Sequence, residues 1–254
     1  MRLVIMETFL GGIQMRKIKN YGWQPDLPHS HKKYAICGLH STTLPSLIDL
    51  RLKCPPVYDQ GNLGSCTANG IAAAIEFVQP GVMPSRLFIY YNERVIEGCQ
   101  DQDAGAQIHD GIKTINNQGA CTETDWPYDE DKFSVKPSDI CYADALKDLI
   151  SDYISLDTIN DIKQCLNTGY PVVFGMTVYS SFEDNAVSIT GMVPMPANDE
   201  EVIGGHCMMI VGYDDSKQCF IVRNSWGMGW GLSGYCYIPY EYISTYATDF
   251  WCIK

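Results

Sequence analysis

The hydrophobic pattern changes type halfway along the 254-residue chain, and this change limits the fold more than any other feature. In the front half, residues 67–78, 85–98 and 106–119 show helical spacing of apolar side chains, and Gly98 and Gly119 end the second and third segments. The back half holds short apolar or β-branched runs separated by turns: PVVFGMTV, HCMMIVGY, CFIVRN and GYCYIP. The pattern predicts an α+β protein of two lobes, helical first and strand-rich second, with a cleft between them.

The chain divides into a short N-terminal arm and a longer body. Residues 1–43 include the irregular stretch YGWQPDLPHSH, which has two prolines and little periodicity. Regular patterns begin at LPSLIDLRLK, so we place the body at residues 44–254. Within the body, the periodicities predict a helical lobe over about residues 44–150 and a β lobe over about residues 151–254.

Charge is distributed unevenly between the arm and the body. The whole chain has a net charge of −12 at pH 7, which argues against a nucleic-acid partner. Residues 1–33 nevertheless hold six basic and two acidic residues, a net charge of +4, which leaves −16 on the remainder. The basic arm is either a solvated tail or a segment that docks on its own acidic body.

The composition does not indicate a membrane protein. Hydrophobic residues make up 46% of the chain and charged residues 19%, which is ordinary for a soluble globular protein. No apolar run approaches the roughly 20 residues that span a bilayer. The apolar start is interrupted by Glu7 and has no clear cleavage site after it. We therefore expect a soluble protein with no transmembrane segment and no signal peptide, in a compartment that the sequence does not assign.

The eleven cysteines show no metal-site pattern. No two of them have the C-x-x-C spacing of a zinc or redox motif. Their number fits five disulfides with one free thiol, and it fits eleven free thiols equally well. They stand at positions 37, 54, 66, 99, 121, 141, 165, 207, 219, 236 and 252.

Cys66 stands where a cysteine can become a nucleophile. It follows a Gly-Ser pair in DQGNLGSCTANG and precedes the helical run IAAAIEF. A helix N-terminus and a nearby imidazolium both lower the pKa of a thiol and populate the thiolate. The alternative is a small buried structural residue, and the presence of a partner histidine decides between the two.

Of the five histidines, His206 is the best partner. It follows two glycines and opens the run HCMMIVGY, so a strand holds it rigidly. Asn224 ends the next run, and a hairpin at residues 214–216 would bring Asn224 beside His206, where it can orient the imidazole. His109 lies in a polar helix and is expected at the surface. The remaining three lie in or near the arm: His29, His31 and His40.

A thiolate that attacks a carbonyl also needs hydrogen-bond donors for the negative oxygen that forms. The backbone N–H of Cys66 is one candidate. The side-chain amide of Gln60, six residues earlier in the same glycine-rich loop, is the other. Together with His206 and Asn224, these residues predict an acyl-transfer site that needs no metal and no organic cofactor.

Three blocks of the sequence carry a resemblance to a known family. DQGNLGSCTANG, GGHCMMIVGY and RNSWGMGWGLSGYCYI resemble the active-site blocks of papain-like cysteine peptidases, and the 140 residues from Cys66 to His206 agree with the spacing in that family. The resemblance covers about residues 44–254 and implies a papain-like peptidase domain with its active site between the lobes. It implies catalytic roles for Cys66, His206, Asn224 and Gln60.

The resemblance also implies substrate-binding residues. Trp226 maps to the indole that shields the His–Asn hydrogen bond from water. Cys207 would help to line the pocket for the second residue on the acyl side of the cut, where its apolar neighbours favour a hydrophobic side chain. The loop that binds the substrate backbone in the family is replaced by DQDAGA, around Gly105.

Several positions depart from the family pattern. Leu63 stands where the family usually has a cysteine, and Thr67 stands where an aromatic residue usually follows the nucleophile. The nearby family disulfide therefore cannot form in the usual way. The 43-residue arm is also too short for a long helical prodomain. These features resemble a divergent microbial or viral branch more than the lysosomal cathepsins.

We therefore expect a cysteine endopeptidase that hydrolyses peptide or protein substrates through a thioester. One alternative keeps the chemistry and passes the acyl group to an amine, as a transpeptidase or other acyl transferase would. Another is a catalytically inert papain-fold binding module, although such relatives typically lose the cysteine or the histidine.

The arm is a candidate propeptide-like segment, because this family commonly keeps itself latent with an N-terminal segment in the groove. Prolines favour an extended backbone, and large apolar side chains can anchor in a cleft. We predict that residues from about Tyr21 to Lys33 pack at or near the cleft holding Cys66 and slow substrate entry, as in a zymogen. An arm packed on the back of the body would explain the same charges. The anchoring side chains are Tyr21, Trp23 and Leu27.

Overall fold

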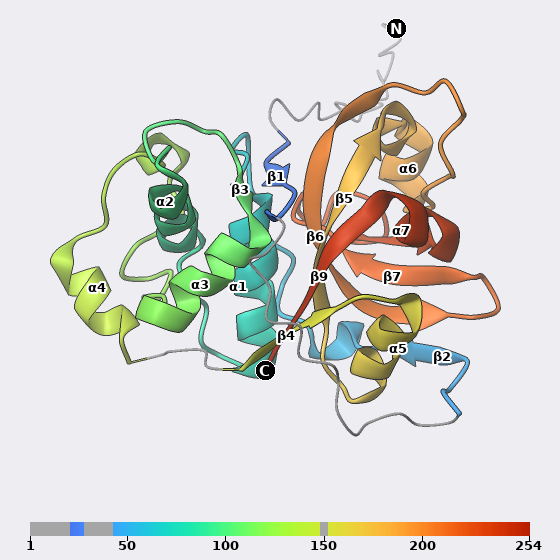
Figure 1. Ribbon diagram of the computed structural model, residues 1–254, viewed down its shortest axis with the longest axis horizontal. Coiled ribbons are helices and arrows are strands. Elements are labelled where there is room, and N and C mark those ends of the chain that lie inside the picture. The colour runs from blue at the N-terminus through green and yellow to red at the C-terminus, as the bar shows by residue number, and fades with distance from the viewer. Residues whose placement is uncertain (1–20, 28–42, 148–151) are drawn as a thin grey trace, which may run out of the picture.

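The computed structural model describes residues 21–27, 43–147 and 152–254, which form two lobes lying side by side (Figure 1). One lobe is helical and the other is built on an antiparallel sheet, so the predicted α+β fold with a helical N-terminal part is confirmed. Residues 28–33, the second half of the segment predicted to dock, lie outside the described residues.

In the described part of the chain, the helical lobe contains α1 (Cys66–Val78), α2 (Arg86–Glu97), α3 (Ile108–Gln118) and α4 (Asp139–Ala145). Eleven of the 13 residues of α1 are buried, so this helix is the centre of the lobe. Ser85 caps α2 by accepting the backbone N–H of Phe88, and Gly98 ends it in the left-handed conformation. The bounds of α1, α2 and α3 lie within two residues of those predicted from periodicity.

The second lobe is built on a seven-stranded sheet of the described residues, in the order β4-β9-β5-β6-β7-β8, with β2 paired to β6. Every pairing in it is antiparallel, and β6 and β7 form the predicted hairpin between Asp214 and Cys219. Its strands are β2 (Leu47–Asp49), β4 (Tyr153–Leu156), β5 (Val172–Tyr179), β6 (Val202–Asp214), β7 (Cys219–Arg223), β8 (Tyr235–Pro239) and β9 (Ala247–Ile253).

Short helices accompany the sheet and the loops. Helix α5 precedes β5, α6 lies between β5 and β6, and α7 connects β8 to β9. The α-helices are α5 (Ile159–Asn167), α6 (Asn185–Thr190) and α7 (Tyr240–Tyr246). The 3₁₀ helices are η1 (Arg51–Lys53), η2 (Glu130–Lys132) and η3 (Ser180–Glu183).

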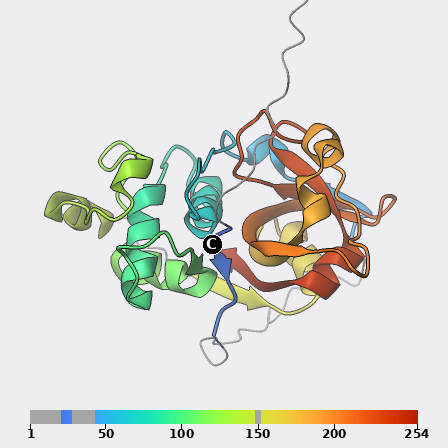
Figure 2. The ribbon, with the colours of Figure 1, turned by 90° about the horizontal axis from the view of Figure 1, so that it is seen from above.

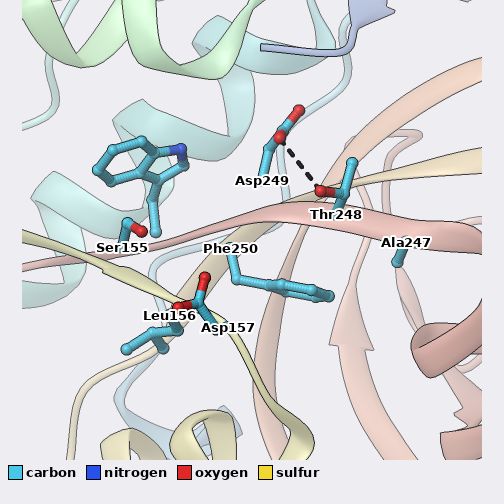
Figure 3. Close-up of a pocket in the computed structure, with 8 residues that line it drawn as sticks. Ser155, Leu156, Asp157, Ala247, Thr248, Asp249 and Phe250 are labelled. Carbon is cyan, nitrogen blue, oxygen red and sulfur yellow. Dashed lines mark hydrogen bonds between the residues drawn. The ribbon is translucent and has the colours of Figure 1, made fainter. Parts of the chain in front are cut away.

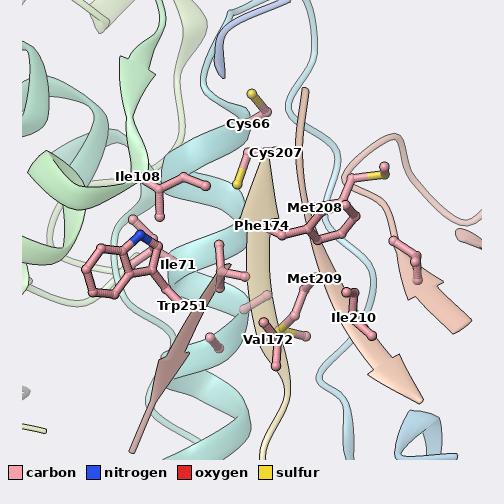
Figure 4. Packing of buried hydrophobic residues seen from close by; sticks show 14 of the residues in the cluster. Cys66, Ile71, Ile108, Val172, Phe174, Cys207, Met208, Met209, Ile210 and Trp251 are labelled. Atoms are coloured by element: carbon pink, nitrogen blue, oxygen red, sulfur yellow. The ribbon is translucent and has the colours of Figure 1, made fainter. Parts of the chain in front are cut away.

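The two lobes share one core where α1 packs on β5 and β6 (Figure 4). Figure 4 shows the Cys207 sulfur directed toward the helix. At Gly70 of α1, an added Cβ would lie 3.1 Å from that sulfur and 3.4 Å from Val173 Cγ1. Small residues on α1 therefore let the helix approach the sheet closely, and this approach brings the start of α1 beside β6.

Some features differ from the sequence predictions. The prediction that His109 lies at the surface is wrong: it is 6% exposed, and its ring stacks on Trp251 with centroids 5.4 Å apart. Helix α3 turns this side chain toward β9, a strand that the sequence did not predict. Strand β9 has no simple alternation, because Asp249 takes a left-handed backbone conformation and the register with β5 shifts between Val173 and Gly175.

Three kinds of feature do not occur among the described residues. No helix in residues 21–27, 43–147 or 152–254 is long and apolar enough to cross a membrane. No group of three or more histidine, cysteine or acidic side chains in these ranges could hold a metal ion. The ten cysteines within these ranges are all free thiols.

Candidate active site

Cys66 is the first residue of α1 and is completely buried. Its position gives it the unpaired N–H groups and the positive end of the helix dipole. Burial raises the pKa of the Cys66 thiol to about 12, although backbone hydrogen bonds from Cys207 and Gly22 act in the opposite direction. Because Cys207 directly follows His206, the backbone contact also places β6 beside the thiol.

His206 and Asn224 are joined by a hydrogen bond, as predicted. The distance from His206 Nε2 to Asn224 Oδ1 is 2.8 Å, and the same oxygen accepts the backbone N–H of Ser225 at 2.8 Å. The second bond fixes which end of the amide faces the ring, so Nε2 carries the proton and Nδ1 is the basic nitrogen. Nδ1 is buried and has no hydrogen-bond partner in the described structure. Burial lowers the pKa of His206 to about 4, which the hydrogen bond to Asn224 only partly opposes.

Trp226 covers this histidine. Its ring centroid lies 4.9 Å from that of His206, and Trp226 is itself 5% exposed. Phe182 of η3 and Trp230 pack edge-on against Trp226 at 5.6 Å and 5.2 Å. His206 and Asn224 are 1% and 2% exposed, so their hydrogen bond lies beneath this aromatic group.

Gln60 connects the loop before α1 to the β lobe. Its Oε1 accepts the Ser225 hydroxyl at 2.6 Å, and its Nε2 donates to the Leu63 carbonyl at 2.9 Å. Its backbone N–H donates to the Ser225 carbonyl at 2.9 Å. These bonds orient the side-chain amide and leave its second N–H available. Thus the structure brings Gln60, Cys66, His206 and Asn224 into one buried site.

The arm runs through this site. Strand β1 (Trp23–Gln24) pairs in parallel with β3 (Ala106–Gln107) and lies between the helices and the sheet in both views (Figures 1 and 2). The Gly22 carbonyl accepts the backbone N–H of Ala106 at 2.7 Å. At Gly105, which has φ of +73°, an added Cβ would lie 2.0 Å from the Gly22 carbonyl oxygen. The loop around Gly105 therefore contacts an extended backbone at close range.

Tyr21 covers the histidine from the arm side. Its ring meets that of His206 edge-on, with centroids 5.9 Å apart, and its hydroxyl donates to Glu183 at 2.6 Å. At Gly204, an added Cβ would lie 2.5 Å from the Tyr21 Cβ. Tyr21 and Gly22 thus contribute to the burial that holds the thiol and the imidazole uncharged.

Asp26 fixes the far end of the described arm. Its carboxylate accepts the backbone N–H of His109 and the indole N–H of Trp251, each at 3.0 Å, and its own N–H donates to Asp249 at 2.9 Å. Burial, with Asp249 nearby, raises the pKa of Asp26 to about 7. Asp249 also lines a pocket between β9 and β4 (Figure 3).

These features bring a cysteine at a helix start, an oriented histidine and a buried glutamine into one buried site. The chain as a whole can also be compared with known proteins. The model of the papain family of cysteine proteases matches residues 44–248. The chain belongs to this family. Gln60, Cys66, His206 and Asn224 lie within the matched range, and the papain-like fold expected from the sequence is confirmed.

Viral, bacterial and animal proteins are similar to this family member. An uncharacterized peptidase C1-like protein of Acanthamoeba polyphaga mimivirus is 47% identical over 213 residues, 77% of this chain and 68% of that protein. Xylellain, a cysteine protease from Xylella fastidiosa, has a TM-score of 0.84 at 42% identity, over 95% of this chain and 98% of that one. Peptidase 1 of Euroglyphus maynei is 29% identical over 79% of this chain but only 63% of its own length. The viral and bacterial relatives agree with the predicted branch.

Sequence reasoning missed a buried carboxyl group beneath the nucleophile. Glu93 of α2 is completely buried and accepts the Thr67 hydroxyl at 2.6 Å, while its other oxygen has no hydrogen-bond partner in the described structure. Burial raises the pKa of Glu93 well above its usual value. Glu93 acts in the same direction as burial on Cys66 and raises the pKa of its thiol. The sequence offered one signal for this carboxyl group: Thr67, a polar residue, stands where the family usually has an aromatic one, and its hydroxyl needs a partner.

Proposed function

We propose that this protein is a cysteine peptidase that hydrolyses peptide bonds through a thioester. The observation that carries the proposal is the fixed His206–Asn224 bond, which leaves Nδ1 basic. The backbone of the next residue, Cys207, contacts the thiol of Cys66 at the start of α1. His206 takes the Cys66 proton, and the thiolate attacks the peptide carbonyl. The imidazolium then returns its proton to the leaving amine. Water, activated by the neutral imidazole, hydrolyses the thioester and releases the acid.

Two donors would stabilise the negative oxygen of the tetrahedral intermediate. One is the backbone N–H of Cys66, and the other is the free N–H of the Gln60 amide, whose orientation is set by Ser225 and Leu63. Donors fixed before the reaction need no reorganisation, and one of them is typically worth about 10²- to 10³-fold in kcat. We assign Trp226 to protecting the His206–Asn224 bond from water.

The described arm is a latency element in this proposal. With Tyr21 and Gly22 in place, the Cys66 thiol is neutral, because burial raises its pKa, and His206 is neutral, because burial lowers its pKa. Release of the arm would hydrate both groups, lower the thiol pKa and raise the imidazole pKa. Both changes favour the reactive thiolate–imidazolium pair. Gly105 would then bind the substrate backbone where it now contacts Gly22.

The test is labelling of Cys66 by an epoxide that reacts with activated thiolates, followed by peptide mapping. We expect slow labelling of the full chain and faster labelling of Tyr21→Ala and Trp23→Ala, which weaken arm docking. Peptide cleavage should likewise be slow in the full chain and faster in the two variants. Mass spectrometry of the products with an added amine separates hydrolysis from acyl transfer, and hydrolysis products should dominate. Equal labelling and cleavage in all three folded proteins would contradict latency, and a Cys66 that never reacts would contradict the peptidase.

A further inference from the structure

The arm residue Gly22 lies in a groove that has backbone on both sides. An added Cβ at Gly22 would lie 1.6 Å from the Gly64 carbonyl oxygen, and one at Gly105 would lie 2.0 Å from the Gly22 carbonyl oxygen. Gly64 belongs to the loop that ends at Cys66, whereas Gly105 directly precedes β3. The spacing between these two loops therefore sets the width of the groove beside the thiol.

The two loops have different tasks toward the chain in the groove. Ala106 of β3 donates its backbone N–H to the Gly22 carbonyl at 2.7 Å, and the Gly22 backbone in turn contacts the Cys66 thiol. A substrate held by the same N–H would place its carbonyl at the sulfur only if the loops keep a fixed spacing. Among the described residues, no disulfide provides it, because the ten cysteines there are free thiols, and β3 pairs with β1 alone.

Asp103 joins the two loops through its side chain. Its Oδ1 and Oδ2 accept the backbone N–H of Gly64 at 2.9 Å and 3.2 Å. On the other side, the Tyr90 hydroxyl donates to Asp103 Oδ1 and accepts the backbone N–H of Gly105 at 3.3 Å. A continuous chain of hydrogen bonds thus runs from Gly64 through the carboxylate and the phenol to Gly105.

Helix α2 holds this chain of hydrogen bonds in place. Tyr90 lies in α2 and is completely buried. Burial and the nearby Asp103 raise the pKa of Tyr90, so its hydroxyl keeps its proton and remains a donor. Arg94, one turn later, donates to the carbonyls of Gln100 and Gln102 at 2.9 Å and 2.7 Å, and its guanidinium lies 3.8 Å from the centroid of the Tyr90 ring. Side chains of one buried helix therefore fix both Asp103 and the loop that carries it.

We propose that Asp103 is a positioning residue for the reaction, which holds the loop of Cys66 at a fixed spacing from the loop whose Ala106 N–H holds the substrate backbone. The proposal rests on the proposed peptidase function. Asp103 would act through Gly64 and Tyr90 and not on the reacting atoms. Without it, a peptide would still be held by Ala106, but its carbonyl would be displaced from the sulfur. A misplacement of about 1 Å can cost about 10²-fold in rate.

The test adds Asp103→Leu to the full chain carrying Trp23→Ala, in which the cleft is open. For a fluorogenic peptide, we expect kcat to fall about 10- to 100-fold, while KM changes little because Ala106 still holds the substrate. Iodoacetamide is a small alkylating reagent that needs the thiolate but not the groove. Its rate at Cys66, followed by peptide mapping, should therefore stay unchanged.

Tyr90→Phe tests the same chain of hydrogen bonds from its other end. It removes the link to the second loop, so kcat should fall here too. Because either substitution breaks the same chain, the double variant should lose much less than the product of the two single losses. Tyr142→Phe is the matched control, because it removes a partly buried hydroxyl that donates to Asn92 of α2 at 2.9 Å. This control should leave kcat unchanged.

The outcomes separate this proposal from the proposed function. An unchanged kcat in folded Asp103→Leu overturns it, and so do equal losses of cleavage and of iodoacetamide labelling, which would show an effect on the thiol or the fold. Losses that multiply in the double variant overturn the link through Tyr90. If Asp103→Leu does not fold, Tyr90→Phe gives the same decision, and Asp103→Asn, which keeps an oxygen for the Gly64 N–H, should retain part of kcat. A Trp23→Ala protein that neither labels nor cleaves contradicts the peptidase itself.

Discussion

The two lobes hold their halves of the site in different ways. The helical lobe positions Cys66 and Gln60 through buried ionic and polar side chains. The β lobe positions His206 and Asn224 through strand register and packed aromatic rings. A ladder of antiparallel strands fixes two backbones directly, whereas a loop before a helix has no ladder and depends on side chains to hold it.

Arg86 is the main side chain that holds the loop on the helical side. Its guanidinium pairs with Glu123 at 2.6 Å and donates to Asn69 Oδ1 at 3.2 Å and to the Asp59 carbonyl at 3.3 Å. The rings of Tyr58 and Tyr128 flank it, and Tyr128 donates to the Gln60 carbonyl at 2.7 Å. The network ends at the backbone carbonyls of Asp59 and Gln60, so it sets the position of Gln60, the donor that we propose for the oxyanion.

On the β side, the buried guanidinium of Arg223, next to Asn224, donates to the Pro55 and Pro56 carbonyls. The surroundings of His206 itself are mainly aromatic. His206 contacts three aromatic rings there, those of Tyr21, Phe182 and Trp226. Aromatic packing tolerates partial loss, because each ring contributes stabilising free energy in proportion to the apolar area that it buries. A buried ion pair is less tolerant, because removing one partner leaves the other charge without compensation. A single substitution should therefore have a large effect in the ionic network of the helical side and a smaller, partial effect among the aromatic contacts of the β side.

The largest effect should come from the two residues that exchange the proton. In the Trp23→Ala background, Cys66→Ala and His206→Ala should each lower kcat by about 10³-fold or more, because either change removes the thiolate–imidazolium pair. Circular dichroism and thermal unfolding check that the fold survives. Peptidase activity that persists in Cys66→Ala would show that a different nucleophile does the reaction.

Arg86→Leu tests the large effect that we expect in the ionic network of the helical lobe. It removes the guanidinium from Glu123, Asn69 and the Asp59 carbonyl, while Glu123 keeps only backbone N–H donors. We expect a loss of about 3 kcal/mol in the free energy of unfolding, measured with urea. Arg51→Leu is the matched control, because the Arg51–Asp49 pair is about one-third exposed and such pairs contribute about 1 kcal/mol or less. Similar losses for the two variants would remove the distinction between the lobes.

Asn224→Ala tests the partial effect that we expect in the β lobe. Asn224 orients the imidazole and makes no bond to substrate, and Trp226 would still pack on the ring. We expect kcat to fall about 10- to 100-fold, less than for a residue that transfers the proton itself. The kinetics should be measured in the Trp23→Ala background, as above. A loss as large as that of His206→Ala would mean that ring packing alone cannot orient His206.

The smallest effect concerns the pH dependence of latency. Docking takes Asp26 from water, where its pKa is near 3.8, to a site where its pKa is about 7, so the docked arm binds a proton. Docking should therefore weaken as pH rises between these values, by at most about tenfold per pH unit, and level off above pH 7.

The measurement is the activity of the full chain divided by that of Trp23→Ala, from pH 5 to 8, since this ratio cancels the titration of the catalytic groups. We expect the ratio to increase with pH and then level off. Asp26→Asn should flatten the profile. A ratio that falls with rising pH would contradict the prediction that protonation of Asp26 favours docking of the arm.

Much of the site could be predicted because its signals are local. Cys66 at a helix start, Gln60 in the same loop, and His206 and Asn224 across one hairpin are all recognisable from short stretches of sequence. The hydrogen bond between His206 and Asn224 agrees with their predicted position as neighbours. The catalytic roles of the four residues stay predictions. The hairpin of β6 and β7 fixes the position of Asn224 relative to His206, so this part of the site depends little on the rest of the chain.

Other features could not be predicted, because their causes lie far away in the sequence. The hydrogen bond of Tyr21 to Glu183 spans 162 residues, and that of Asp26 to Trp251 spans 225. His109 seemed exposed because its helix is polar, but β9 covers it with Trp251. Burial of such a residue depends on what a distant strand brings to it, which helical periodicity does not encode.

The sequence by itself determined that a helical half precedes a strand-rich half, and which four residues are expected to form the site, since periodicity, caps and a hairpin act over a few residues. Only the tertiary structure decided what fills the cleft. Gly175 is an unremarked strand residue until Trp23, 152 positions earlier, is found against it. Packing excludes overlap between atoms wherever they come from in the chain, so the reason for that glycine exists only in the folded protein.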